Sequence, residues 1–303
     1  VFGGPEVLFE YHRDSFFDEL KAENTYFVLG EGERALLDIC RSMYHQQLIE
    51  CTIHKGKKLI AYNEIPQLDK LPFLDFDART LQWYDSPTLP LFSSRGCMRR
   101  CSFCSEHKLY KNFRQHSPEY VLTLIKSLVE KHRTHSFSFH DSLINANLQW
   151  LNLFCELLMQ ENLGIQWEAQ LAIRGDMAKP LFDTMKAAGC FNLFIGLESA
   201  SDRILALMQK GYDSATAKEF FQKLACAGLH YEVRIITGFP RETEDDFEKT
   251  LQFLKSNKHC IPKIAQVNPF VEYAPSQINF SEPQCKVIAA QRVQRLLAMF
   301  KEN

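Results

Sequence analysis

Short apolar runs alternate with amphipathic stretches along most of this chain, and the alternation predicts strands that are each followed by a helix. Ser117 is the expected N-cap of the first of these helices, with Pro118 at its first position. Gly189 and Gly228 are expected to end two later helices. The pattern predicts strands at residues 89–93, 136–140, 165–173, 191–197, 230–237 and 264–271. It predicts helices at residues 118–131, 148–158, 181–188 and 247–254, and helical stretches up to residue 227.

Six such repeats favour an α/β fold with a parallel sheet and right-handed crossovers. A complete eight-fold barrel usually needs about 250 residues, more than these repeats contain. We therefore expect a partial (β/α)6 TIM-like barrel over residues 88–280, followed by a C-terminal helical extension over 281–303. Ligands of such folds collect at the carboxyl ends of the strands.

A different unit is expected ahead of the barrel. Residues 26–29 read as a strand, and the turn at 30–33 leads into a helix at 34–44. Residues 1–62 therefore resemble the end of an α/β unit, and residues 63–87, with Pro66, Pro72 and several Asp, read as a linker. The chain starts at Val1 without an initiator Met, so it looks cut from something longer.

Composition narrows the class of protein. The chain is 46% hydrophobic with a net charge of −2, so neither nucleic acid nor an anionic membrane is an expected partner. It has no run of eighteen apolar residues that would span a membrane. Of ten cysteines only three are clustered, and we expect the rest to be reduced core residues of a cytoplasmic protein. These are Cys40, Cys51, Cys155, Cys190, Cys226, Cys260 and Cys285.

The three clustered cysteines are Cys97, Cys101 and Cys104, in the spacing C-x3-C-x2-C. Three thiolates can hold a 4Fe–4S cluster and leave one iron without a protein ligand, open to a substrate. The alternative is a structural zinc site, in which His107 would complete a Cys3His set.

Together with the repeats, this triad resembles the signature of the radical S-adenosylmethionine superfamily, in which an aromatic residue, here Phe103, precedes the last cysteine. Residues 189–199 are similar to the family's fourth strand. Residues 236–243 resemble its "GFPGET" segment, with Arg241 in place of the usual glycine. The resemblance implies a 4Fe–4S cluster that splits S-adenosylmethionine into methionine and a 5′-deoxyadenosyl radical, which abstracts hydrogen from an unactivated C–H bond.

The same resemblance suggests which residues contact S-adenosylmethionine. Phe103 would lie beside the cluster, or simply plug its loop. Asp141 would contact the methionyl amine, against the alternative of a helix cap or turn residue. Arg174 would form a fork with the methionyl carboxylate, against an ion pair with Asp176.

Further along the chain, Glu198 and Ser199 resemble the ribose-binding motif, with helix capping as the alternative. Gln170 is a weaker candidate from a half-buried strand. Ile236 would pack on adenine or belong to the core, and Gly238 would allow close backbone approach or form a turn.

The N-terminal unit resembles the end of the cobalamin-binding domain that precedes many radical enzymes of this type. Its candidate cobalamin contacts are Gly3, Gly4, Gly30, Glu31 and Gly32, against the alternative of ordinary βα turns. The linker is also similar to theirs, whereas any cobalt-binding histidine motif would lie upstream.

The resemblance implies an enzyme that uses S-adenosylmethionine, a 4Fe–4S cluster and cobalamin to methylate an unactivated carbon of a small-molecule substrate. Reduced ferredoxin or flavodoxin would supply electrons, and the basic residues Arg99, Arg100 and Lys108 would either attract such a donor or keep the loop soluble. The alternatives are radical cyclisation, rearrangement or oxidation, then methylthio transfer, and a non-enzymatic zinc module.

Overall fold

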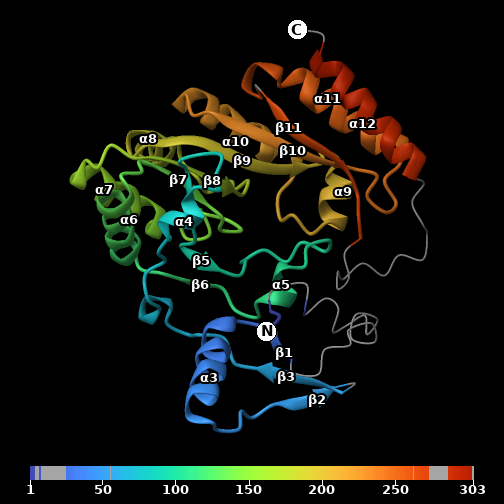
Figure 1. Ribbon diagram of the computed structural model, residues 1–303. Coiled ribbons are helices and arrows are strands. Elements are labelled where there is room, and N and C mark those ends of the chain that lie inside the picture. The colour runs from blue at the N-terminus through green and yellow to red at the C-terminus, as the bar shows by residue number, and fades with distance from the viewer. Residues whose placement is uncertain (4–6, 8–24, 55, 262, 273–285, 302–303) are drawn as a thin grey trace.

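The computed structural model describes residues 1–303 apart from 4–6, 8–24, 55, 262, 273–285 and 302–303. Figure 1 shows a large α/β unit above a small α/β unit, joined on one side by a connecting segment. Short helical turns, η1 (Leu68–Lys70) and α4 (Ala78–Leu81), interrupt that segment, which the sequence pattern presents as a plain linker.

The large unit is built on six parallel strands, as predicted. Their order in the sheet is the order in the chain, so every crossover leads to the neighbouring strand. This arrangement confirms the partial barrel. The strands are β4 (Leu89–Leu91), β7 (Ser136–Phe139), β8 (Gln166–Leu171), β9 (Cys190–Glu198), β10 (Tyr231–Thr237) and β11 (Ile264–Pro269).

Helices fill the crossovers at bounds close to those predicted (Figure 1). Ser117 caps the first of them, its hydroxyl accepting the Tyr120 N–H at 3.2 Å, and Pro118 is its first residue. The barrel helices are α6 (Pro118–His132), α7 (Leu148–Glu161), α8 (Lys179–Ala187), α9 (Asp202–Leu207), α10 (Ser214–Ala227) and α11 (Glu244–Ser256). The C-terminal helix is α12 (Lys286–Lys301).

The core lies between the sheet and these helices. Phe139 on β7, Phe154 on α7 and Trp167 on β8 meet edge to face with centroids 5.6–6.2 Å apart, and all three are fully buried. Each such side chain stabilises the fold by about 1.5–3 kcal/mol. The opposite, inner face of the sheet carries half-buried residues at alternate positions of β8 and β10.

In the residues that the structure describes, the small unit contains a sheet of three strands and a long helix. The strands β1 (Tyr26–Leu29), β3 (Lys57–Ala61) and β2 (Thr52–His54) lie in that order, and α3 (Gly32–His45) follows β1 as expected. The sequence pattern shows β1 and α3 but not the β2–β3 hairpin. The apolar clusters of this unit are separate from the barrel core, so each unit buries its own apolar side chains.

The scattered cysteines are only partly core residues. Cys155, Cys190 and Cys260 are buried, but Cys40 and Cys226 are exposed, so the expectation is wrong for those two. They lie on helices α3 and α10, which each turn one face to solvent. Cys51 is half-buried, and Cys285 lies outside the described residues. Within the described ranges, no helix is both long enough and apolar enough to cross a membrane.

Candidate functional site

The three clustered cysteines lie on a loop that a small antiparallel ribbon closes at its base. The ribbon pairs β5 (Ser94–Arg95) with β6 (Arg114–Gln115), and residues 96–113 between them form what we call the cluster loop. The loop begins at Gly96, whose φ is +80°. A Cβ at this position would lie 2.8 Å from the Asn112 carbonyl oxygen, so only glycine fits there.

Backbone amides of the loop point at two of the sulfurs. The Arg99 N–H donates to Cys97 Sγ at 3.4 Å, and the Glu106 N–H donates to Cys104 Sγ at 3.5 Å. Burial raises the pKa of the Cys97 thiol to about 11 and also raises that of Cys104. Amide donors to sulfur stabilise and tune ligated thiolates, so the loop fits an iron–sulfur cluster.

The zinc alternative has no support from this geometry. Over the residues that the structure describes, no three His, Cys, Asp or Glu side chains lie close enough together to hold one metal ion. A single zinc needs its four ligands at one point, whereas each thiolate of a cluster binds a different iron. His107, the fourth ligand in the zinc alternative, is a buried residue of α5 (Glu106–Leu109).

The cluster loop is fastened to the carboxyl ends of β8 and α9. The Arg99 guanidinium donates to the Lys210 carbonyl at 2.8 Å and to the Ile173 carbonyl at 3.0 Å. Ser102 donates through its N–H to Met208 O and through its hydroxyl to Leu207 O, both at 3.0 Å. Arg99 is therefore an internal anchor of the loop and not part of a docking surface, whereas Arg100 is exposed.

Glu198, at the end of β9, forms a buried ion pair that sequence reasoning missed. Its carboxylate lies 3.3 Å from Lys210 Nζ, and both side chains are largely buried. The Lys210 ammonium also lies over the rings of Phe103 and Tyr212, at 5.8 Å from each centroid. Burial alone would lower the pKa of Lys210, but Tyr212, Glu198 and Cys101 nearby raise it, so this ammonium stays charged.

The backbone at Glu198 is strained. Its φ is +63°, in the left-handed region. This conformation is energetically unfavourable for a residue that has a side chain, and it is common at ligand sites. A Cβ on Gly196 would lie only 2.2 Å from Glu198 Oε1, so the glycine makes room for this carboxylate. Glu198 and Lys210 together present one anionic and one cationic group beside the cluster loop.

Two other predicted contacts, Phe103 and Ile236, lie in an apolar cluster next to this pair, and Gly238 forms a turn beside it. Phe103 and Ile236 pack with Phe239, whose ring meets Phe103 edge-on at 6.4 Å. Gly238 has a φ of +75°, and its N–H donates to Glu242 Oε2 at 2.6 Å. The structure thus shows Phe103 packed as a plug of its loop and Gly238 in a turn, which are the alternatives to their ligand roles.

Asp141 lies at the end of β7 and is completely buried. Its carboxylate accepts the Ser93 N–H at 2.9 Å, the Ser93 hydroxyl at 2.8 Å and the Ser94 hydroxyl. Burial raises its pKa in spite of these donors. The geometry favours the alternative of a turn residue, here one that ties β7 to the strand that enters the cluster loop. Contact with a methionyl amine remains a prediction.

Arg174 and Ser199 are likewise engaged inside the protein. The Arg174 guanidinium forms a fork with the Asp176 carboxylate at 2.8 and 2.6 Å. It also donates to the carbonyls of Asn145 and Ala146 in the loop between β7 and α7. The Ser199 hydroxyl lies 3.1 Å from the hydroxyl of Thr250 on α11 and accepts a backbone N–H. Arg174 thus forms the alternative ion pair with Asp176. Ser199 binds the N–H of Ser201 and the Thr250 hydroxyl but is not the N-cap of α9, which is Ser201. The ligand roles of both residues remain predictions.

Gln170 lies on the inner face of the sheet, where alternation along β8 and β10 places it beside Arg234. Its Oε1 is 3.5 Å from Arg234 Nη1, and the Arg234 guanidinium lies 4.9 Å above the Phe194 ring. Arg234 therefore points into the barrel, which the sequence pattern leaves undecided.

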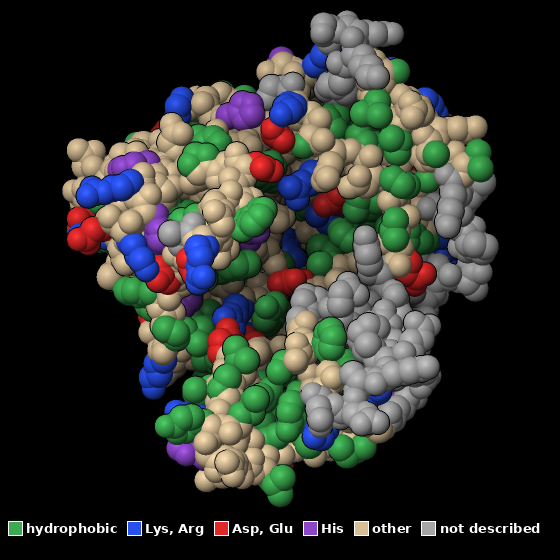
Figure 2. Space-filling model, in the orientation of Figure 1, with side chains coloured by type: hydrophobic (Ala, Val, Ile, Leu, Met, Phe, Trp, Pro, Cys, Tyr) green, Lys and Arg blue, Asp and Glu red, His purple; other side chains and the backbone are tan. Residues whose placement is uncertain are grey.

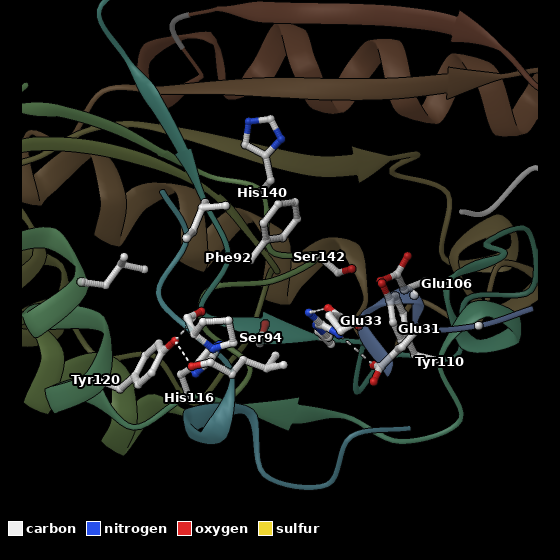
Figure 3. Close-up of a pocket in the computed structure, with 17 residues that line it drawn as sticks. Glu31, Glu33, Phe92, Ser94, Glu106, Tyr110, His116, Tyr120, His140 and Ser142 are labelled. Carbon is white, nitrogen blue, oxygen red and sulfur yellow. Dashed lines mark hydrogen bonds and ion pairs between the residues drawn. The ribbon is translucent and has the colours of Figure 1, made fainter. Parts of the chain in front are cut away.

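A pocket of about 440 Å³ lies between the small unit and the barrel (Figure 3). Gly30, Glu31 and Gly32 of the small unit line it, together with residues at both ends of the cluster loop. Aromatic rings make up much of the remaining wall, from Phe92, Tyr110, His116, Tyr120 and His140. Figure 2 shows acidic and basic side chains gathered along the hollow between the two parts of the molecule.

The pocket brings together most of the residues predicted to contact cobalamin. Gly30 has a φ of +89°, which a turn into α3 requires, and Gly32 is the first residue of that helix. Gly3 lies against Val28 of β1, outside the pocket lining, and Gly4 is outside the described residues.

Comparisons with known proteins extend this description. Residues 91–254 match the family described as the radical SAM superfamily. An uncharacterized methyltransferase of Pyrococcus horikoshii is 30% identical over 280 residues, which are 84% of this chain and 57% of that protein. An anaerobic magnesium-protoporphyrin IX monomethyl ester cyclase of Rubrivivax gelatinosus is 26% identical over 75% of this chain and 44% of its own length.

Among solved structures, the fold is similar to that of the cobalamin-dependent S-adenosylmethionine radical enzyme OxsB with aqua-cobalamin and S-adenosylmethionine bound. The TM-score is 0.71 at 19% identity, over 99% of this chain and 43% of that one. The chain spans about half the length of the curated relatives that it matches.

Proposed function

Because this chain belongs to the radical SAM superfamily, we propose that it forms the catalytic barrel of an enzyme for cobalamin-dependent methylation of an unactivated carbon. The family implies a 4Fe–4S cluster and S-adenosylmethionine as cofactors. The observation that carries the proposal is the position of the cluster loop, which has Glu198 and Lys210 on one side and the pocket of the small unit on the other.

Cys97, Cys101 and Cys104 are the proposed ligands of three irons. When bound, the cluster supplies the electron that splits S-adenosylmethionine into methionine and a 5′-deoxyadenosyl radical. The protein holds the loop rigid through Arg99 and Ser102 and donates amide hydrogen bonds to the sulfurs. Phe103 and Phe239 form an apolar wall that excludes water from this side of the cluster.

Glu198 and Lys210 are the proposed ligands for the polar groups of S-adenosylmethionine. A carboxylate accepts hydrogen bonds from two ribose hydroxyls, and a buried ammonium pairs with a carboxylate. The Lys210 ammonium is close to the cluster loop: it lies over the Phe103 ring, and the Arg99 guanidinium of the loop donates to the Lys210 carbonyl. We therefore assign Lys210 to the methionyl carboxylate and Glu198 to the ribose.

The pocket beside Gly30, Glu31 and Gly32 is the proposed contact surface for cobalamin, which when bound carries the methyl group to be transferred. A glycine turn at a helix start offers backbone N–H groups at close approach. Support comes from the methyltransferase relative and from the fold shared with a cobalamin-dependent enzyme.

The test is anaerobic reconstitution of the full-length protein with iron, sulfide and cobalamin. We expect a brown protein that retains cobalamin through gel filtration and forms 5′-deoxyadenosine from S-adenosylmethionine under reducing conditions. A variant with alanine at Cys97, Cys101 and Cys104 is the control and should form none. A colourless, zinc-bound wild type without 5′-deoxyadenosine would refute the radical proposal. An active protein that does not retain cobalamin would refute methyl transfer.

A second candidate is radical chemistry without methyl transfer, such as cyclisation, which the similarity to a cyclase favours. The two candidates differ in the fate of the methyl group. With S-adenosylmethionine labelled in its methyl group, a methyltransferase labels the bound cobalamin, whereas a cyclase leaves it unlabelled.

A further inference from the structure

Glu31, in the glycine turn of the small unit, carries a carboxylate that is buried and bonded on several sides. Its side chain is 4% exposed. It accepts the Ile65 N–H at 2.7 Å and pairs with Arg114 Nη2 at 2.6 Å and with Arg95 Nη1 at 3.3 Å. Ile65 belongs to the linker, and both arginines belong to the barrel unit, so three separate segments meet at one carboxylate.

The two arginines hold the two ends of the cluster loop. Arg95 is the last residue of β5 and Arg114 the first of β6, and they face each other in the register of the ribbon. Cys97 follows Arg95 after a single glycine. A carboxylate placed between these guanidiniums cancels their mutual repulsion and holds the two strand ends together.

Neighbouring acidic groups strengthen the same junction. Glu33 pairs with Arg95, and Glu64 lies 3.8 Å from Arg114 Nη2 and accepts the Asn112 side-chain amide at 2.8 Å. The Ile65 carbonyl accepts from Arg114 Nη1 at 2.8 Å. In Figure 3, Glu31 and Glu33 lie at the pocket end near Tyr110 and Glu106. Every charged contact of the ribbon described here thus runs to the small unit or the linker.

We propose that Glu31 is a positioning residue that fixes the cluster loop against the glycine turn of the small unit, so that cluster and corrinoid keep one separation. The proposal rests on the function proposed above, because it assigns the turn to cobalamin. Glu31 itself does not touch the reacting atoms. It acts through Arg95 and Arg114 on the loop, and through its own backbone on the turn.

Substitution of a residue that only joins the two units would change hydrogen exchange in a different way. Its loss would loosen the whole small unit or lower the stability of the whole protein. Loss of a positioning residue instead raises the mobility of the cluster loop and the glycine turn while the rest of both units keeps its protection. Hydrogen exchange separates these cases because it reports each segment individually.

The test compares Glu31→Gln with the wild type in the reconstituted protein. Glutamine keeps the shape and still accepts from Ile65, but it has no charge for the two arginines. Glu161→Gln is the matched control, because Glu161 forms a solvent-exposed pair with Lys126 at 2.7 Å on the far helices α6 and α7. We measure hydrogen exchange of peptides over residues 96–113 and 30–33, and the affinity for aquacobalamin by absorbance titration.

We expect Glu31→Gln to raise exchange in the cluster loop and the turn about tenfold and to weaken aquacobalamin binding, with the barrel strands unchanged. Glu161→Gln should change neither. Unchanged exchange in the cluster loop, or an equal rise throughout the protein, would overturn the proposal. If Glu31→Gln does not fold, Arg95→Lys, which keeps the charge but loses the fork, answers the same question.

The two proposals fail in different ways. If the wild type assembles its cluster but binds no aquacobalamin, the proposed function is wrong, and the exchange of the cluster loop still decides whether Glu31 fixes that loop against the glycine turn. If the wild type binds aquacobalamin and the Glu31→Gln loop is as protected as before, only the positioning role is wrong.

Discussion

Gly196 and Glu198 show how a single missing Cβ shapes the candidate ligand site. The carboxylate folds back over Gly196 to reach Lys210. In Gly196→Ala the new methyl group would meet Oε1 at 2.2 Å, so the carboxylate must swing away from Lys210. We expect the affinity for S-adenosylmethionine to fall about tenfold with the fold intact, because one hydrogen-bonding group is displaced.

Isothermal titration of the reconstituted protein measures this effect. Gly175→Ala is the matched control, since its Cβ would approach nothing closer than Thr216 Cγ2 at 3.4 Å. Equal affinities for Gly196→Ala and the wild type would mean that Glu198 does not bind S-adenosylmethionine.

Lys210 is the second residue on which this site depends. Lys210→Gln removes the buried ammonium and leaves the Glu198 carboxylate without its partner. If the ammonium binds the methionyl carboxylate, KM for S-adenosylmethionine should rise at least about tenfold in the 5′-deoxyadenosine assay. Lys249→Gln, which breaks only an exposed pair with Asp245, should leave KM unchanged. A normal KM for Lys210→Gln would remove the lysine from the site.

The sequence predicts some of these residues and not others, for a physical reason. The cysteine triad is local, so its spacing predicts a metal site, although the spacing alone leaves zinc open beside an iron–sulfur cluster. Asp141, Arg174 and Ser199 are chemically suitable ligands, yet the structure engages them with Ser93, Asp176 and Thr250. The partners of Asp141 and Ser199 lie about fifty residues away in the chain, beyond the reach of a local pattern, whereas the Arg174–Asp176 pair is local and was one of the two alternatives predicted. The sequence did not point to Lys210, because Lys210 and Glu198 lie on either side of helix α9 in the chain and meet only in the folded protein.

Arg241 is a substitution in the family's motif that leaves the backbone conformation unchanged. It replaces the glycine of the family's motif, which made the conformation of its loop uncertain from sequence. The structure keeps a φ of +66° there, so the loop retains a left-handed conformation that suits glycine. The backbone carbonyl of Arg241 accepts from Arg203 Nη2 at 2.6 Å, which helps to hold this conformation.

At the scale of elements, helix α12 supports the loop that follows β10. Arg292 on α12 donates to Glu242 Oε2 at 2.6 Å, and the same oxygen accepts the Gly238 N–H. The Arg292 and Glu242 side chains are 5% and 1% exposed. The helix is therefore connected to the proposed adenine-binding segment through one buried ion pair.

Breaking this pair should be costly. Burial already raises the pKa of Glu242, and Arg292→Ala would leave that carboxylate buried without its charge partner. We expect a loss of about 3–5 kcal/mol in the free energy of unfolding, measured by urea denaturation. Arg295→Ala, which removes exposed pairs with Glu244 and Glu248, should cost less than about 1 kcal/mol. Similar losses in the two variants would contradict the special role of Arg292.

The helices and strands that bury the most apolar surface were the ones predicted from the sequence. The six barrel strands and their helices have clear periodicity, because each packs one face into the core. The β5–β6 ribbon has only two residues in each strand, and the charged contacts of its arginines hold it in place. It therefore has no apolar pattern in the sequence. The β2–β3 hairpin is missed for a similar reason, since β2 has no buried residue.

For the whole molecule, the junction of the two units should depend on pH. Burial of Glu31 opposes its charge, but hydrogen bonds from Arg114 and Ile65 and the charge of Arg95 lower its pKa below the ordinary 4.5. A carboxyl with a lowered pKa stabilises the folded state above its unfolded pKa and loses that contribution as the pH falls. The junction should thus weaken below about pH 4.5.

Hydrogen exchange of residues 96–113 and 30–33 at pH 7 and near pH 4, corrected for the intrinsic rate, measures this change. We expect protection of the cluster loop and the glycine turn to fall at the lower pH, and the pH dependence to be smaller in Glu31→Gln. An equal dependence in both proteins would assign the acid sensitivity to other carboxyl groups.

The anchor at Arg292 also has a consequence during protein synthesis. The cysteines and all six barrel strands leave the ribosome before α12 does, because α12 follows them in the chain. A nascent chain can therefore form the cluster loop while the segment from Gly238 to Glu242 still lacks its arginine. The proposed S-adenosylmethionine site is therefore completed only after α12 has been synthesised, later than the cluster loop.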